Sequence, residues 1–207
     1  MIDLWDWRRA IADLYADIRR NPDPVAAWSQ WRATRDHLFA HHPQSPIPPQ
    51  ARATYPGIPL FAYDPALRHH VALTPVADAE IEEFPAGEDG VLRMRPFART
   101  DGLRAALGGE LTLFWITGYG GGVFLPFADA TSGHETYGAG RYLLDTIKGA
   151  DLGSASGGML VLDFNFAYAP SCAYSDRYVC PLAPAGNRLP AAIRAGECVM
   201  AHAVHDP

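Results

Sequence analysis

The chain has 207 residues, of which 48% are hydrophobic and 19% are charged, so it is long enough for one folded domain and too apolar for a disordered one. Its net charge of −6 and the absence of a lysine or arginine cluster argue against a nucleic acid or an anionic membrane as a partner, since both need a basic surface. The chain contains 19 glycines and 18 prolines, which favours frequent turns and β architecture.

The N-terminal residues lack the basic start and apolar run of a signal peptide, and no stretch approaches the roughly 20 apolar residues of a membrane span. We therefore expect a cytoplasmic protein. Its cysteines are Cys172, Cys180 and Cys198, and an odd number in a reducing compartment favours free thiols. The separation of Cys172 and Cys180 is short enough for a disulfide, so their bonding stays open.

Two helices are predicted at the start of the chain. Residues 3–19 carry an apolar stripe at three- and four-residue spacing, and a second helix begins at the Asp23-Pro24 cap and runs to about Phe39. Trp28 and Trp31 on this second helix are expected to pack on a large flat surface such as a sheet face, rather than to stack on a ligand. Residues 1–42 therefore form a helical arm.

Beyond a proline-rich connector the pattern changes to short apolar runs bounded by Pro, Gly or Asp, which predicts strands. The predicted strands are residues 58–63, 71–74, 80–84, 91–97, 103–107, 111–117, 123–127, 142–147, 159–164 and 194–199. Gly108-Gly109 predicts a tight hairpin between 103–107 and 111–117. The sequence therefore predicts a single, mainly β domain over residues 1–207: an antiparallel sandwich or barrel (residues 55–200) with the helical arm packed on it.

Two stretches are dense in polar and aromatic residues: 129–143 (DATSGHETYGAGRYL) and 162–174 (LDFNFAYAPSCAY), the second continuing to Cys180-Pro181-Leu182 and to residues 187–190. From about Trp31 to Glu197 the chain resembles domain-of-unknown-function family 1684, a bacterial family with no settled activity. Members of that family usually carry a basic residue where this chain has Phe166, and an asparagine where it has Ala169. If these positions face a pocket, the resemblance implies a more apolar ligand than the usual one.

The polar residues in these stretches have two explanations, and both stay open. In the first, Arg141 pairs with Asp163 or Glu135 and fastens two loops together. In the second, the loops 129–142 and 163–180 form a pocket in which Arg141 clamps an anion and tyrosines supply walls and hydroxyl donors. The candidate ligand-binding residues are then Arg141, Tyr142, Asp163, Asn165, Phe166, Tyr168 and Tyr174.

Catalytic candidates are His134, Glu135, Asp163 and Tyr142. His134 and Glu135 are adjacent, and neighbours on an extended segment point in opposite directions, so they do not form a dyad by themselves. Cys172 would need a histidine within reach to act as a nucleophile. No Gly-x-Ser-x-Gly nucleophile elbow is present.

No cofactor and no metal are predicted. The sequence has no Cys-x-x-Cys pair and no dinucleotide fingerprint, and the histidines at 69, 70, 202 and 205 do not form a recognised ligand pattern.

Three hypotheses follow. The first is a module that binds a small molecule, and the alternative is a cofactor-independent isomerase, cyclase or hydrolase that acts on a carbonyl or carboxylate compound in the same pocket. The third is an interaction protein that docks through exposed tryptophans at positions 5, 7, 28 and 31. The oligomeric state stays open.

Overall fold

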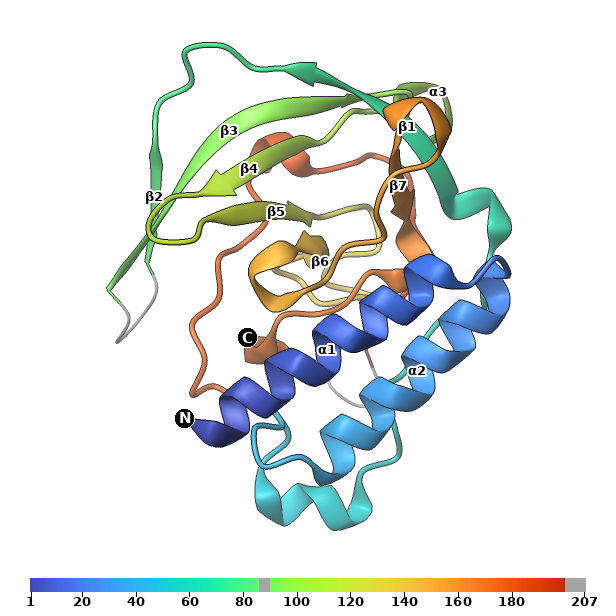
Figure 1. Cartoon of the computed structure of the whole chain (residues 1–207), viewed down its shortest axis with the longest axis vertical. Coiled ribbons are helices and arrows are strands. Elements are labelled where there is room, and N and C mark those ends of the chain that lie inside the picture. The colour runs from blue at the N-terminus through green and yellow to red at the C-terminus, as the bar shows by residue number, and fades with distance from the viewer. Residues whose placement is uncertain (86–89, 200–207) are drawn as a thin grey trace.

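The computed structural model of the chain describes residues 1–85 and 90–199 (Figure 1). Within these residues, seven strands form one antiparallel sheet in the order β6-β5-β4-β3-β1-β7, with β2 paired to β3. The strands are β1 (Arg68–Pro75), β2 (Glu82–Pro85), β3 (Val91–Asp101), β4 (Thr112–Ile116), β5 (Gly122–Phe127), β6 (Arg141–Asp145) and β7 (Leu160–Asp163). The predicted mainly β, antiparallel fold is confirmed.

The sheet curls until its two edges nearly meet. Tyr142 lies in β6, at one edge, and Tyr168 follows β7, at the other edge. Their backbones exchange two hydrogen bonds, from the Tyr142 N–H to the Tyr168 carbonyl (2.9 Å) and from the Tyr168 N–H to the Tyr142 carbonyl (3.1 Å). Of the two predicted arrangements, the chain therefore adopts a nearly closed barrel.

Apolar side chains fill the barrel. Five of the strands contribute aliphatic residues that are almost fully enclosed, namely Val71, Leu113, Leu125, Leu143 and Leu162, whereas the short β2 contributes no buried residue. Burying one such aliphatic side chain stabilises the fold by about 1.5–3 kcal/mol. These residues hold the strand ends, and the loops that leave them, in place.

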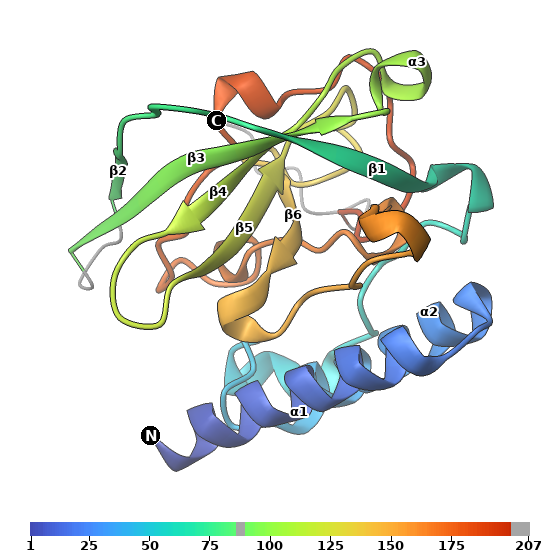
Figure 2. The same ribbon diagram turned by 45° about the horizontal axis from the view of Figure 1, so that its top comes forward.

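The predicted helical arm is confirmed as α1 (Ile2–Arg20) and α2 (Pro24–His41). The Asp23 carboxylate caps α2, because it accepts the N–H groups of Val25 (2.9 Å) and Ala26 (3.1 Å). The two helices lie side by side as a separate layer against one side of the barrel (Figure 2). No helix in the described part of the chain has the length and apolar character needed to cross a membrane.

The second helix fastens the arm to the barrel through its tryptophans. Trp28 donates its indole N–H to the Asn165 carbonyl (3.0 Å), and the Trp31 ring packs edge-on against Phe166 with 5.5 Å between ring centroids. Trp31 is fully buried, whereas Trp5 on α1 is 63% exposed. Trp28 and Trp31 therefore pack on the turn that follows β7 (Phe164–Phe166), and not on the sheet face that the sequence suggested.

The predicted hairpin around Gly108-Gly109 is wrong. Residues 103–107 are not a strand, because Arg104–Leu107 form a short helix, α3, that ends at Gly108. Gly108 takes the left-handed conformation (φ 78°), which is a common way to end a helix. The glycine pair therefore stops a helical turn before β4 begins.

The predicted strands 58–63 and 194–199 are also wrong as regular strands. They do pair with each other, but only through one bridge between Leu60 and Glu197. Proline at 59 has no N–H to donate, and Gly196 has a positive φ of 73°, so neither segment can extend the ladder. This bridge nevertheless brings Glu197 close to the helical arm.

Candidate functional site

Arg141 in β6 is enclosed, with 1% of its surface exposed. Its Nη2 donates to the Asp129 carboxylate (2.8 Å) and to the Ile193 carbonyl (2.9 Å). Its Nη1 donates to the carbonyls of Glu197 (3.1 Å) and Ala195. Arg141 thus ties β6 to the loop after β5 and to the last described segment of the chain.

The predicted partners of Arg141 were wrong, since both carboxylates are engaged elsewhere. Asp163, at the end of β7, accepts hydrogen bonds from the Tyr63 hydroxyl and the Arg68 guanidinium, each at 3.0 Å. Glu135 forms a surface ion pair with Arg194 (2.7 Å). Sequence reasoning missed Asp129 as the partner because its position two residues before Thr131-Ser132 also fits a self-contained turn.

Two further candidates stabilise the turn after β7. The Asn165 side chain accepts the Asp64 N–H and donates to the Asp64 carbonyl, both at 2.8 Å. Phe166 is 1% exposed and packs against Trp31. Neither Asn165 nor Phe166 reaches the hollow described next.

A cavity of about 360 Å³ lies between the helical arm and residues 168–181, and we call it the arm cavity. Three of the candidate ligand-binding residues line it: Tyr142, Tyr168 and Tyr174. Arg141, Asp163, Asn165 and Phe166 do not, and neither do His134 and Glu135. The structure therefore brings together the predicted aromatic walls around a different charged centre.

That centre is Arg35, on the buried side of α2. Arg35 is 6% exposed, lines the arm cavity, and donates from Nη2 to Glu197. The other Glu197 oxygen accepts the Ala169 N–H and the Tyr174 hydroxyl, both at 2.7 Å. Within the described residues, Nε of Arg35 has no hydrogen-bond partner and no bond from Nη1 is found.

Aromatic rings surround the Arg35 guanidinium. Its central carbon lies 4.9 Å from the centroid of the Trp31 ring and 5.0 Å from those of Phe39 and Tyr168. Such contacts stabilise a cation that has left water. One sequence signal existed: Arg35 is in register with Trp31 and Leu38 on the apolar stripe of the helix, where an arginine is unusual.

The tyrosine hydroxyls of the arm cavity are neutral donors. Burial raises the pKa of Tyr15 to about 12 and that of Tyr168 well above its ordinary value, so both keep their protons at neutral pH. The Tyr15 oxygen accepts the Trp31 indole N–H (3.1 Å), which leaves its own O–H to donate. The Tyr142 hydroxyl is already committed, because it donates to the Pro181 carbonyl (2.7 Å).

Among the described residues, the charged side chains that line the arm cavity are all positive: Arg8, Arg35 and Lys148. Glu197 balances Arg35, and Asp145 balances Lys148 at 2.9 Å. Arg8 has no ion pair within the described residues, so the surroundings carry one net positive charge. The cavity therefore offers donors and positive potential to a guest.

The two positions at which the chain departs from the resembled family differ in their surroundings. Ala169 lines the arm cavity, whereas Phe166 packs behind it against Trp31. An apolar residue at 169 removes one polar group from the wall. The expectation of a more apolar pocket therefore rests on Ala169 alone.

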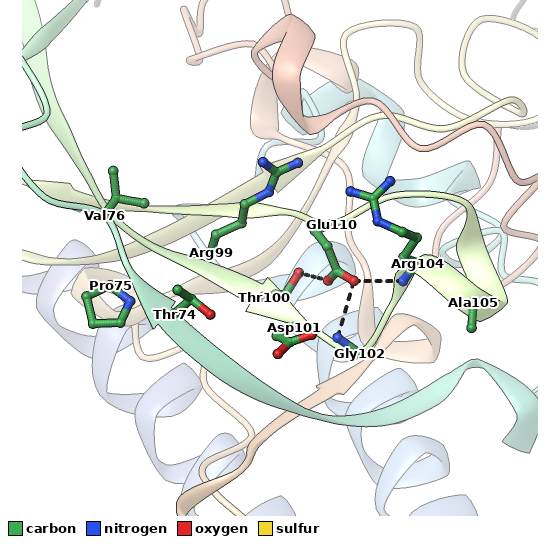
Figure 3. A pocket seen from close by; sticks show the side chains of 10 residues that line it. All are labelled: Thr74, Pro75, Val76, Arg99, Thr100, Asp101, Gly102, Arg104, Ala105 and Glu110. Carbon is green, nitrogen blue, oxygen red and sulfur yellow. Dashed lines mark hydrogen bonds between the residues drawn. The ribbon is translucent and has the colours of Figure 1, made fainter.

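A second hollow, of about 870 Å³, is a wide groove beside the ends of β1 and β3 (Figure 3). Its carboxylate, Glu110, accepts the Thr100 hydroxyl (2.6 Å) and the N–H groups of Gly102 (3.2 Å) and Arg104 (2.8 Å). Burial alone would raise the pKa of Glu110, but these hydrogen bonds outweigh it and lower the pKa. Glu110 thus stabilises its own loop and has little capacity left for a ligand.

Metal ligation has little geometric support. Among the described residues, no three His, Cys, Asp or Glu side chains gather as a metal ion would require. His69 points its ring edge-on at Phe164, and burial lowers its pKa, so it stays neutral. The histidines at 202 and 205 lie outside the described residues.

The fold and the site together define a small, nearly closed β-barrel with a helical arm and a cavity between them. The chain belongs to the family described as Protein of unknown function (DUF1684), whose model matches residues 53–198. An uncharacterized protein of Haloarcula marismortui, solved by NMR in solution, is 32% identical over 83% of this chain and 91% of its own, with a TM-score of 0.55. No curated protein matches the chain significantly.

Proposed function

We propose that this protein binds a small molecule with an apolar or aromatic body and one anionic group, held in the arm cavity. The observation that carries the proposal is Arg35, a buried cation with an uncommitted Nη1 at the wall of an aromatic cavity. Small-molecule sites commonly combine apolar walls with a few polar groups that fix the orientation of the ligand.

The body of the ligand follows from the walls. Rings of Trp7, Phe39, Tyr168 and Tyr174 line the cavity, and the volume of about 360 Å³ is at the small end for ligand sites. Flat apolar surfaces stack favourably on such rings. Ala169 and Pro170 add apolar side chains to the wall, so a compact, mostly apolar body fits best.

The anionic group follows from the donors. Arg35, Arg8, Lys148 and the hydroxyl of Tyr15 can donate to a guest, and no Asp or Glu side chain is among the described residues that line the cavity. A guanidinium binds a carboxylate through charge-assisted hydrogen bonds, which are stronger than neutral ones. A neutral ligand would leave these donors unsatisfied, so the ligand class is a small organic anion.

The enzyme alternative has less support. His134 is exposed, and Glu135 is held by Arg194 at the surface. Asp163 is saturated by Tyr63 and Arg68 and does not line the arm cavity. Only Tyr142 among the catalytic candidates lines it, and its hydroxyl donates to a carbonyl. We therefore favour binding without chemistry.

Calorimetric titration with 3-phenylpropionate and its neutral amide tests this proposal. We expect the carboxylate to bind at least tenfold more tightly than the amide, since a good charge-assisted contact contributes about 1.5–3 kcal/mol. Arg35→Met should reduce carboxylate binding to the level of the amide. Arg32→Met is the matched control, because Arg32 lies on the same helix with its side chain 53% exposed and should leave binding unchanged.

Equal affinity for the acid and the amide would contradict the anionic ligand class. Undiminished binding in Arg35→Met, with a melting curve that shows a folded protein, would contradict the placement of the site. If Arg35→Met does not fold, Arg35→Lys keeps a cation but loses the planar fork, and it should still weaken carboxylate binding several-fold.

A further inference from the structure

Residues 170–181 form one wall of the arm cavity and carry two cysteines. The Cys172 and Cys180 thiols are free, and the side chain of each is the largest influence on the pKa of the other. The Tyr137 hydroxyl donates to the Cys172 sulfur at 3.5 Å. Cys180 itself lines the cavity.

The two sulfurs are not equivalent. Cys172 accepts hydrogen bonds from Cys180 and from Tyr137, and these outweigh burial and lower the pKa of Cys172 to about 6. The same contact raises the pKa of Cys180, which keeps its proton. Because the thiolate is the nucleophile, Cys172 is poised to react first and Cys180 to follow.

Access and spacing support a reaction between them. Both cysteines are only partly buried, so a small oxidant can reach them. They lie eight positions apart in a loop without strand pairing, where a disulfide closes a short ring. Solvent-accessible thiolates next to a second cysteine are typical of redox-sensitive sites.

We propose that Cys172 and Cys180 form a reversible oxidation site for hydroperoxides in the wall of the arm cavity. The Cys172 thiolate attacks one oxygen of hydrogen peroxide, so that a sulfur–oxygen bond forms, the oxygen–oxygen bond breaks, and the departing hydroxide takes a proton and leaves as water. The Cys180 sulfur then attacks the Cys172 sulfur; the disulfide bond forms, the sulfur–oxygen bond breaks, and the hydroxyl of the sulfenic acid leaves as water with the proton of Cys180. Two thiols are oxidised, one peroxide is reduced to two waters, and a dithiol reductant reverses the reaction.

This disulfide would restrict the motion of one wall of the arm cavity. The ring that it closes contains Tyr174 and Tyr178, which both line the arm cavity. Cys180 precedes Pro181, whose carbonyl accepts the Tyr142 hydroxyl. Oxidation would therefore fix the segment that holds three cavity tyrosines. The oxidation itself does not depend on the proposed ligand.

The test is to treat the reduced full chain with a small excess of hydrogen peroxide at pH 7 and to follow its intact mass and its free thiols. We expect the mass of the chain to fall by two hydrogen atoms and a disulfide-linked peptide pair containing Cys172 and Cys180. Cys198 should stay open to alkylation, because burial raises its pKa. The reaction at Cys172 should be at least about tenfold faster than that at Cys198, since a far larger fraction of Cys172 is thiolate at this pH.

Variants separate the steps. Cys180→Ser should accumulate a sulfenic acid that dimedone traps at position 172, and Cys172→Ser should react at the slow rate of an ordinary thiol. Cys198→Ser is the matched control and should behave like the wild type. Wild-type oxidation that leaves both Cys172 and Cys180 free, or that pairs either with Cys198, would overturn the proposal without bearing on ligand binding.

Discussion

The molecule contains two buried arginine–carboxylate pairs that use the same chemistry for different ends. Arg141 and Asp129 are 1% and 0% exposed, and backbone carbonyls surround the guanidinium. Arg35 and Glu197 are also buried, at 6% and 1%, but aromatic rings and a cavity surround them. The two pairs differ in the hydrogen-bond donors that each guanidinium leaves unused.

Arg141 uses both of its Nη atoms within the protein, whereas Arg35 uses only Nη2 among the described residues. The first arrangement fastens loops, and the second leaves a donor at a cavity wall. Both pairs meet at the same segment, because the Glu197 carbonyl accepts from Arg141 while its carboxylate accepts from Arg35. Because Nε has no partner in either arginine among the described residues, Arg35 is distinguished by its unused Nη1 and by the cavity that it lines.

The largest effect is expected when the fastening pair is broken. Arg141→Ala leaves the Asp129 charge buried without its cation, so the free energy of unfolding should fall by about 3–5 kcal/mol. Urea denaturation measures this, and the folded fraction should still bind 3-phenylpropionate. A loss below about 1 kcal/mol, as for a surface pair, would show that Arg141 is not a fastener.

The next largest effect is expected at Gly196, which directly precedes Glu197, the residue that both Arg35 and Arg141 contact. Its φ is 73°, and an added Cβ would lie 2.4 Å from the Ala167 carbonyl oxygen. Gly196→Ala should therefore lower the free energy of unfolding by about 1–3 kcal/mol and weaken ligand binding as well. Gly186→Ala is the control, because a Cβ there has nothing within 4 Å and the φ is ordinary. Equal melting temperatures for the two variants would contradict this account.

Breaking the Arg35–Glu197 pair should lower the free energy of unfolding less than breaking the Arg141–Asp129 pair does. It should weaken ligand binding more. Arg35→Met leaves Glu197 with the Ala169 N–H and the Tyr174 hydroxyl, so we expect a loss of about 2 kcal/mol in unfolding free energy. The double variant Arg35→Met, Glu197→Gln should recover part of that stability and none of the carboxylate affinity. Recovery of binding in the double variant would mean that Arg35 does not contact the ligand.

Glu110 offers a smaller, pH-dependent effect, and it lines the groove and not the arm cavity. Its pKa is lowered in the folded protein, so its contribution is present above an ordinary pKa of 4.5 and is lost as the pH falls through the lower folded value. Glu110→Gln should cost about 1 kcal/mol at pH 7, because charge-assisted bonds to the Thr100 hydroxyl and to the N–H groups of Gly102, Leu103 and Arg104 become neutral ones. Melting curves of the two proteins should converge below pH 4.5, and a constant difference would argue against the charge as the cause.

The smallest effect is expected at His134, which is exposed and does not line the arm cavity. His134→Ala should change the free energy of unfolding by less than about 0.5 kcal/mol. Its calorimetric affinity for 3-phenylpropionate should match the wild type. A loss of affinity would move the site to the loop at residues 129–142.

Local patterns in the sequence predicted much of the fold. The apolar spacing from Leu4 to Ile18 gave α1, and the Asp23-Pro24 pair gave the start of α2, because both signals act within a few residues. The segment at 103–107 was mispredicted because a glycine pair can end either a helical turn or a strand. Which of the two forms depends on what Leu103 and Leu107 pack against in the barrel.

The candidate site was predicted only in part, for a similar reason. Tyr142, Tyr168 and Tyr174 were expected in a pocket, since their density near loops is visible in the sequence. Arg35 and Glu197 are 162 residues apart. Glu197 is placed by its bridge to Leu60 and by hydrogen bonds of its backbone to Ala167 and Arg141. No local pattern encodes such a contact, so the sequence suggested Arg141 as the anchor instead.

The most direct test of the account is an NMR titration of the ¹⁵N-labelled chain with 3-phenylpropionate. We predict shift changes at the Ala169 amide and the Trp7 indole N–H, with the Glu110 loop unchanged. Shift changes confined to residues 129–136 or to the groove at Glu110 would contradict the arm cavity as the ligand site.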